Sequence, residues 1–147
     1  MGLALLCAPL LGCSAAPPAN HLTRGYDIGV AQVAPFGRIL VDMQGRTLYI
    51  YKPDHQTAST CLGACAVVWP PLLLSGPESD KSLGPGVDPT LVGSVRDSDG
   101  SVQLTYEKWP LYTFRFDKSA GATTGQGDDN DIWQVIRPNG EPISASS

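Results

Sequence analysis

Apolar and polar residues alternate in two short stretches of the chain, 47–51 and 110–116, and this alternation predicts two β-strands. Successive side chains of a strand point to opposite faces, so aromatic residues that recur at every second position share one face. We expect the two aromatic faces to pack together as the core between the strands, with tryptophans around them. The face residues are Tyr49, Tyr51, Tyr112, Phe114 and Phe116, and the tryptophans are Trp69, Trp109 and Trp133.

The two stretches are copies of one motif, separated by 63 positions. The first reads Leu-Tyr-x-Tyr-x-x-Asp from position 48, and the second reads Leu-Tyr-x-Phe-x-x-Asp from position 111. The match extends upstream, where Ile39–Val41 aligns with Val102–Leu104, and downstream, where Trp69 falls one residue from Trp133. An internal match of this length predicts a domain built from two copies of one supersecondary unit.

Turn signals beside these stretches predict β-hairpins. Residues 39–42 and 46–51 flank Gln44–Gly45, where glycine can take the positive φ of a tight two-residue turn. The second copy repeats this pattern around Glu107–Lys108, and another hairpin turn is expected at 97–100. The remaining strands are expected at 30–33, 92–96, 102–106 and 132–136.

These elements predict an all-β fold class, with two pseudo-repeated hairpin or meander units packed as a small sandwich or barrel-like domain. Sixteen Gly, thirteen Pro and a charged fraction of 16% favour turns and short strands over long helices. The length of 147 residues suits a single domain, which we expect over 29–147, with repeats at about 29–74 and 92–140. The net charge of −4, without a basic stripe, argues against nucleic acid as a partner.

The first residues of the chain predict export. Residues 2–12 are apolar or small, and this run is shorter than the roughly 20 residues that span a bilayer, so we expect a signal peptide over 1–12. Leu10–Cys13 resembles a bacterial lipobox, in which the cysteine is diacylated and becomes the new N-terminus. We therefore expect 13–28 to be a lipidated tether that holds the protein on the bacterial cell membrane. The alternative is a plain secretory signal, with Cys13 incidental.

Cys61 and Cys65 are the two cysteines left in the domain, and in an exported protein such a pair indicates a disulfide. Residues four apart lie about 13 Å apart in a strand but about 6 Å apart in a helical turn, and only the second distance can be bridged. The pair therefore predicts a short helical turn near 61–68. The alternative is a redox dithiol or a soft-metal site, with His55 or Met43 as a further ligand.

Asp54 and Asp117 follow the two aromatic strands. Each can close its turn by accepting hydrogen bonds from backbone N–H groups, and the alternative is a pair of metal-binding or proton-handling carboxylates. The aromatic faces have an alternative of their own, a platform on which a ligand stacks. Asp128–Asp131 offers oxygen ligands for Ca²⁺ but lacks the spacing of an EF-hand loop, and a solvated loop is expected there.

With both copies laid out, the chain resembles the bacterial secreted-repeat lipoproteins named for a Yx(F/W/Y)xxD motif. The first copy supplies Tyr49, Tyr51 and Asp54, and the second supplies Tyr112, Phe114 and Asp117. Further matching features are Cys61 and Cys65, Trp69–Leu72, Pro110–Tyr112, Gly125–Gly127 and Trp133. The resemblance covers about residues 29–140. It implies a place in the cell envelope and no reaction, because the family has no established molecular activity.

The residues suggest no catalytic site. His55 is the single histidine of the domain, and no nucleophile motif accompanies it. We therefore expect a non-enzymatic binding or structural module of the cell envelope, without metal or cofactor. The alternative is a redox-active or copper-handling envelope protein that uses Cys61 and Cys65.

Overall fold

A computed structural model describes residues 26–54, 56 and 58–145. The predicted signal peptide, the lipidation site Cys13, most of the tether and His55 therefore lie outside the described residues. Within the described ranges, no helix has the length and apolar character needed to cross a membrane.

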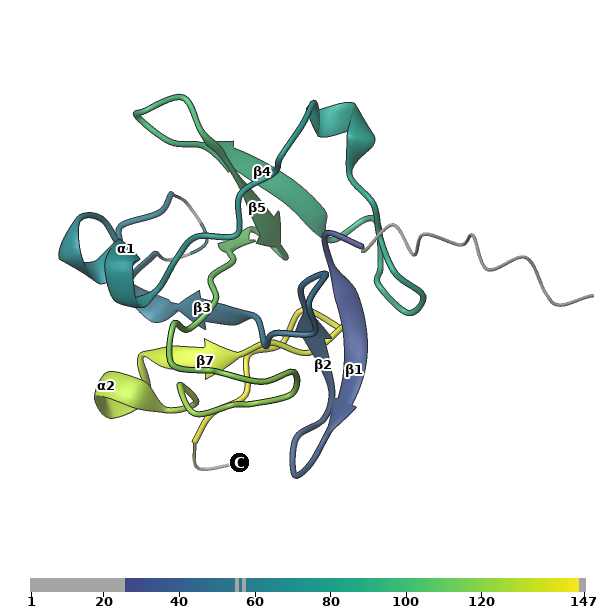
Figure 1. Cartoon of the computed structure of the whole chain (residues 1–147), viewed down its shortest axis with the longest axis vertical. Coiled ribbons are helices and arrows are strands. Elements are labelled where there is room, and N and C mark those ends of the chain that lie inside the picture. The colour runs from purple at the N-terminus through teal and green to yellow at the C-terminus, as the bar shows by residue number, and fades with distance from the viewer. Residues whose placement is uncertain (1–25, 55, 57, 146–147) are drawn as a thin grey trace, which may run out of the picture.

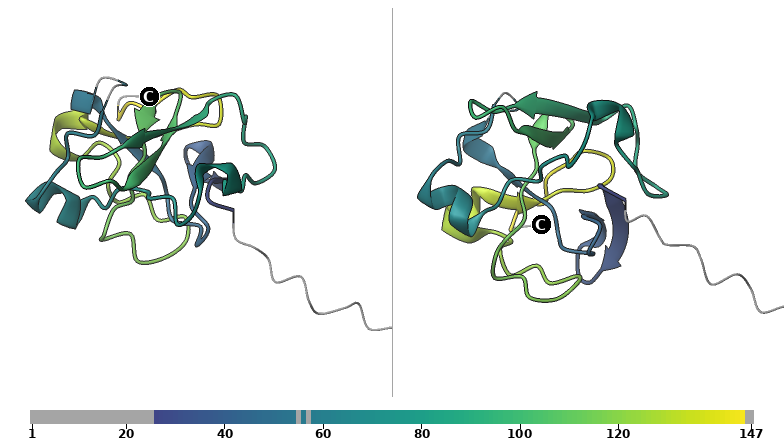
Figure 2. Two further views of the ribbon diagram at one scale, coloured as in Figure 1. Left: turned by 90° about the horizontal axis from the view of Figure 1, so that it is seen from above. Right: turned by 45° about the horizontal axis from the view of Figure 1, so that its top comes forward.

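Short strands make up most of the regular structure, as the all-β prediction expects (Figure 1). Two short helical segments, α1 and α2, lie at the same end of the molecule in every view (Figures 1 and 2). Single 3₁₀ turns cover Lys52–Asp54 and Glu78–Asp80. The elements are β1 (Gly29–Val33), β2 (Gly37–Val41), β3 (Tyr49–Tyr51), α1 (Ala64–Val68), β4 (Val92–Arg96), β5 (Val102–Tyr106), β6 (Trp109–Pro110), α2 (Asp128–Asp131) and β7 (Trp133–Val135).

The strands form three small antiparallel sheets. β1 pairs with β2, β3 pairs with β7, and β4, β5 and β6 form a three-stranded sheet in that order. The described strands do not close into a barrel, so of the two predicted architectures the arrangement is nearer to packed sheets. The β3–β7 pairing joins the first repeat to the second, with Tyr51 opposite Trp133.

The two repeats meet at their motif tyrosines. Tyr49 N–H donates to Tyr112 O at 2.9 Å, and Tyr112 N–H donates to Tyr49 O at 3.0 Å. Such a reciprocal pair is the hydrogen-bonded site of an antiparallel ladder, and it relates the two copies by a local twofold arrangement. The prediction of an all-β fold with two repeat-like hairpin regions is confirmed.

One of the two predicted hairpin turns has the predicted length, and the other is longer. Glu107 and Lys108 both take positive φ, 46° and 66°, and they connect the paired residues Tyr106 and Trp109 as a two-residue turn. The turn at Gln44–Gly45 is longer than predicted, because Asp42 N–H bonds to Arg46 O and leaves three residues in the loop. Gly45 supplies its one positive φ, 77°.

The predicted strand 46–51 is also shorter than expected. Val41 and Thr47 form a single antiparallel bridge, and the chain then leaves β2 to pair with β7 from Tyr49 onward. β2 instead has its full-length partner in β1, with Gly29 opposite Val41. Tyr49–Tyr51, which the hairpin pattern predicts to pair with β2, therefore pair with β7 of the second repeat instead.

Both faces of the motif strands are buried, which gives the domain two hydrophobic clusters. Tyr49 and Tyr112 lie in one cluster with no exposed surface, as the alternation predicts. Leu48 and Leu111, on the opposite face, lie in the second cluster and are equally buried. Hydrophobic burial on both sides fixes the register of these strands, because a slip of one residue would exchange the two sets.

Two aromatic residues depart from the predicted core. Phe116 is 52% exposed, because the chain turns at 114–117, where Asp117 N–H bonds to Phe114 O, and the strand alternation no longer applies. Trp109 packs against the second cluster with Leu48 and Leu111 instead of joining the other two tryptophans.

Candidate functional site

The motif side chains of the two repeats bind each other. Tyr49 of the first repeat donates its hydroxyl hydrogen bond to Asp117 Oδ2 of the second, at 2.7 Å. Tyr112 of the second repeat donates to Asp54 Oδ2 of the first, also at 2.7 Å. Each motif therefore supplies a tyrosine to the other repeat and receives one in return. We call these four residues the reciprocal lock.

The other carboxylate oxygen of each lock aspartate accepts hydrogen bonds from a threonine six or seven residues later in the chain and so closes the loop between them. Asp54 Oδ1 accepts bonds from Thr60 N–H at 2.8 Å and Thr60 Oγ1 at 2.6 Å. Asp117 Oδ1 accepts the same two bonds from Thr124, at 2.9 and 2.6 Å. Both aspartates are buried, at 0% and 6% exposure, so each carboxylate is committed to several internal donors.

A column of stacked aromatic rings lies beside the lock. Trp69 and Trp133 stack at 3.8 Å between ring centroids, with planes 3° apart. Tyr51 stacks on the outer side of Trp133 at 4.4 Å, and Phe114 stacks on the outer side of Trp69 at 4.2 Å. The column contains the second aromatic residue of each motif at its two ends, so it follows the same local twofold arrangement.

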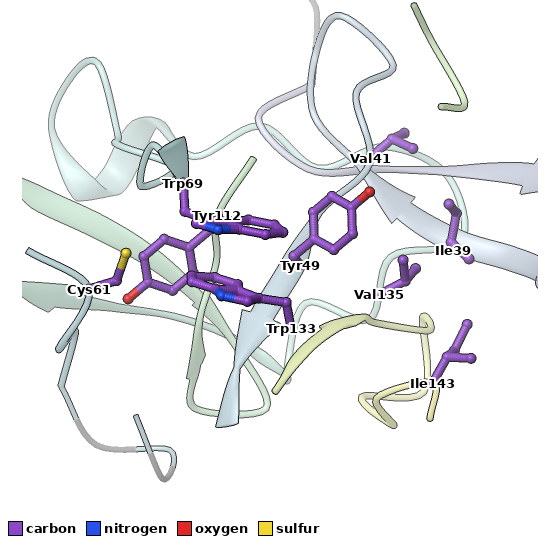
Figure 3. Packing of buried hydrophobic residues seen from close by; sticks show 9 residues of the cluster. All are labelled: Ile39, Val41, Tyr49, Cys61, Trp69, Tyr112, Trp133, Val135 and Ile143. Carbon is purple, nitrogen blue, oxygen red and sulfur yellow. The ribbon is translucent and has the colours of Figure 1, made fainter. Parts of the chain in front are cut away.

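The two lock tyrosines pack against the sides of the column. Tyr49 meets Trp69 edge-on at 5.3 Å, and Tyr112 meets Trp133 edge-on at 5.2 Å. Figure 3 shows the two indole rings one above the other, with the tyrosine rings beside them. Because Trp69 and Trp133 are 4% and 3% exposed, their faces are filled by neighbouring rings. The faces of these two tryptophans are therefore not open to a ligand that would stack on them.

The predicted disulfide is present between Cys61 and Cys65, whose Cα atoms lie 5.2 Å apart. Cys65 lies in the short helix α1, and the turn just before this helix, in which Cys65 N–H donates to Leu62 O at 3.2 Å, gives the short spacing that the sequence predicts. Cys61 is 2% exposed and belongs to the aromatic cluster, so the bridge fixes α1 against the core. Met43 is 55% exposed and lines a different hollow from Cys61, so the structure does not bring these two predicted ligands together.

The acidic loop Asp128–Asp131 forms α2, whose inner residues have left-handed φ values of 50° to 65°. Asp131 is engaged by Gln134 Nε2 at 2.7 Å and Ala145 N–H at 2.8 Å, with Lys52 at 3.5 Å. Asp128 and Asp129 are exposed to solvent. Among the described residues, no three His, Cys, Asp or Glu side chains form a group that could hold a metal ion.

Two hollows on the described surface lie apart from the lock. A hollow of about 220 Å³ beside Cys61 is lined in part by Ser59, Leu62 and Asp97, but neither lock aspartate contributes to it. A second hollow, of about 220 Å³, lies between the Asp42–Arg46 turn and Pro70–Leu73. Neither of these two hollows brings Asp54 and Asp117 together with the Cys61 loop.

Burial raises the pKa of both lock tyrosines well above the usual value of 10. For Tyr49 the largest cause is loss of solvation, and the hydrogen bond to Asp117 adds to it. For Tyr112 burial is again the largest cause, and Asp54 raises the pKa further. The lock is thus built for neutral phenol hydroxyls that donate to carboxylates.

We expect the domain to lose stability above pH 10. The unfolded tyrosines ionise near pH 10 while the folded ones stay neutral, so the folded state holds more protons and each rise in pH favours unfolding. Tyr49 and Tyr112 should each lower the free energy of unfolding by up to about 1.4 kcal/mol per pH unit in this range. Urea unfolding between pH 9 and about pH 12 measures the slope. Tyr49→Phe should reduce it, and an unchanged slope in that variant would contradict the assignment.

Sequence reasoning placed the lock aspartates as turn-closing residues but missed their tyrosine partners. The internal repeat was the one signal for these partners. When two copies of a motif pair antiparallel at their tyrosines, the end of each motif lies beside the start of the other, so the aspartate of one copy lies near the tyrosine of the other. The two bonds join residues 68 and 58 positions apart, so a comparison of the copies at equal positions does not show them.

The fold and the lock define a class: a small all-β domain made of two interlocked repeats, each with a tyrosine, a second aromatic residue and an aspartate. A family model described as a secreted repeat of unknown function matches residues 31–73 and 93–137, more than half of the chain. The chain belongs to this family of secreted repeats, and membership implies export. No curated protein and no solved structure gave a match.

Proposed function

We propose that this protein is a lipid-anchored component of the bacterial cell envelope whose β domain acts as a non-enzymatic binding or structural module. The observation that carries the proposal is the reciprocal lock. Asp54 and Asp117 are buried, and each accepts hydrogen bonds from a threonine of its own repeat and a tyrosine of the other. Their role in this arrangement is to hold the repeats together, which supports a scaffold for recognition at the surface.

Anchoring is supported by the lipobox-like sequence Leu10–Cys13 together with membership of a secreted family. Two acyl chains on one cysteine give stable membrane attachment, whereas a single chain binds only marginally. An ordinary secreted protein carries no lipid after its signal peptide is removed. A lipoprotein should therefore be found in the membrane fraction, and a plain secreted protein in the soluble fraction.

The test of anchoring is membrane fractionation of cells that express Cys13→Ser. We expect the native protein to pellet with membranes and to enter the detergent phase, and the variant to appear in the soluble fraction. Cys7→Ser is the matched control, because Cys7 lies inside the predicted signal peptide, and it should pellet like the native protein. If Cys13→Ser also enters the detergent phase, the lipid anchor is refuted.

The alternative is a redox role for Cys61 and Cys65. The ease with which the disulfide is reduced distinguishes this role from a structural one. We expect thiol alkylation of the exported protein to find this pair fully oxidised and resistant to mild reductant, since Cys61 is buried. The closed loop is short, so replacing both cysteines with alanine should cost about 2 kcal/mol by chain entropy. A pair that mild reductant opens readily, or that binds copper stoichiometrically after reduction, would favour the redox role instead.

A further inference from the structure

The turn that ends the second motif exposes an aromatic ring close to two cations. Phe116 is 52% exposed, Arg115 lies with its guanidinium carbon 5.3 Å from the Phe116 ring centroid, and Lys118 Nζ lies 5.8 Å from it. We call these three residues the basic–aromatic tip. The first repeat lacks an equivalent, because Pro53 stands where Phe116 stands in the second.

Neither cation of the tip has an acidic partner in the described part of the chain. The ion pairs found there join Arg46 to Asp42 and Lys52 to Asp131. Lys118 donates instead to the backbone oxygen of Arg115, at 2.8 Å. In a chain with a net charge of −4, the tip is thus a place where positive charge and apolar surface coincide.

The tip is held rigidly by the lock beneath it. Phe116 meets Phe114 edge-on at 5.3 Å, and Phe114 is the end of the aromatic column. Arg115 N–H bonds to Val68 O at 3.0 Å, and Asp117, the next residue after Phe116, is fixed by Tyr49 and Thr124. A ring presented on such a fixed base loses little conformational entropy when it binds.

We propose that the basic–aromatic tip is a second membrane contact, in which Phe116 enters the interface of an anionic bilayer while Arg115 and Lys118 engage lipid phosphates. Aromatic residues flanked by Lys and Arg favour this region of a bilayer. The proposal rests on the lipid anchor proposed above. The chain from Cys13 to Tyr26 reaches at most about 45 Å when fully extended, so an anchored domain stays close enough for the tip to touch the lipid.

This contact would give the domain a fixed orientation on the membrane. Binding by the tip alone is weak, because each Lys or Arg near an anionic surface contributes only about a fivefold gain in affinity. The anchor removes this difficulty, since it makes tip binding an intramolecular step at high effective concentration. The opposite end of the domain would then be presented outward to partners.

The test uses the full exported protein in vesicles, with an environment-sensitive fluorophore on Phe116→Cys. We expect a blue-shifted emission, quenched by lipid-borne quencher, in phosphatidylglycerol–phosphatidylcholine vesicles, and little shift in phosphatidylcholine alone. Leu73→Cys is the matched control, because Leu73 is 44% exposed but forms a bridge with Gln103 of β5, and its label should stay in water. Adding Arg115→Gln and Lys118→Gln to the Phe116→Cys protein should abolish the shift.

A second measurement separates the tip from the anchor. Unlipidated full chain carrying Cys13→Ser should bind phosphatidylglycerol vesicles weakly in low salt, and Phe116→Ser should lower that affinity about tenfold. This result is expected whether or not the native protein is lipidated. A label at position 116 that stays in water on anionic vesicles, or a label at position 73 that shifts equally, would overturn the proposal.

Discussion

Asp117→Ala is expected to lower the free energy of unfolding by about 3–5 kcal/mol. The substitution removes a buried carboxylate that accepts bonds from the Thr124 backbone, the Thr124 hydroxyl and the Tyr49 hydroxyl. The tyrosine hydroxyl is then left buried without its acceptor, and such a group costs about 1–3 kcal/mol by itself. Urea unfolding followed by tryptophan fluorescence measures the loss.

The local twofold arrangement adds a stronger expectation, namely that Asp54→Ala has nearly the same cost. Its carboxylate accepts the equivalent bonds from Thr60 and Tyr112. Asp128→Ala is the matched control, because Asp128 is exposed, and it should change stability by less than about 0.5 kcal/mol. A loss at Asp54 or Asp117 no greater than that of the control would show that the lock does not stabilise the fold.

A double-mutant cycle identifies the cross-repeat partner directly. Tyr49→Phe and Asp117→Asn should couple by about 1.5–3 kcal/mol, as a hydrogen bond to a charged group does. Tyr49→Phe with Asp54→Asn, the pairing within one motif, should be close to additive. The reverse pattern would place the tyrosine bonds inside each repeat and refute the exchange.

The alternation of side chains predicted the core where the chain remains extended and failed where it turns. Tyr49 and Tyr112 sit in paired backbone, so the period of two assigns their faces correctly. Phe116 lies beyond the turn at 114–117, where the same count no longer describes direction. Trp109 belongs to β6, whose neighbours direct its ring to the other cluster, and a lone tryptophan in a sequence does not show which of two clusters it joins.

The disulfide and the turn-closing aspartates were predictable because both are local. Two cysteines with three residues between them can be bridged only across a tight turn, and the structure has such a turn where α1 begins. The lock hydroxyls and the four-ring column depend on how two copies meet, and that relation is set by the β3–β7 pairing. The internal repeat predicted that the two copies pack together, but it did not predict how they are oriented relative to each other.

The second large effect is expected at the centre of the aromatic column, from Trp133→Ala. Its ring stacks on Trp69 and Tyr51 and receives the edge of Tyr112, and it is 3% exposed. Removing a buried tryptophan typically costs about 3–5 kcal/mol, through lost transfer energy and the cavity left behind. We expect a loss of this size in urea unfolding. The exciton signal of two stacked indoles should also vanish from the circular dichroism spectrum.

Trp109→Ala is the matched control for this experiment, since Trp109 is only partly buried and touches the other cluster. It should cost about 1–2 kcal/mol and leave the exciton signal intact. Because the column joins residues of both repeats, its loss at Trp133 should destabilise the whole domain in one transition. Two separate transitions in the variant would mean that the repeats fold independently, and that the column is not what unites them. A loss no larger than that of Trp109→Ala would show that the stacking contributes little beyond ordinary burial.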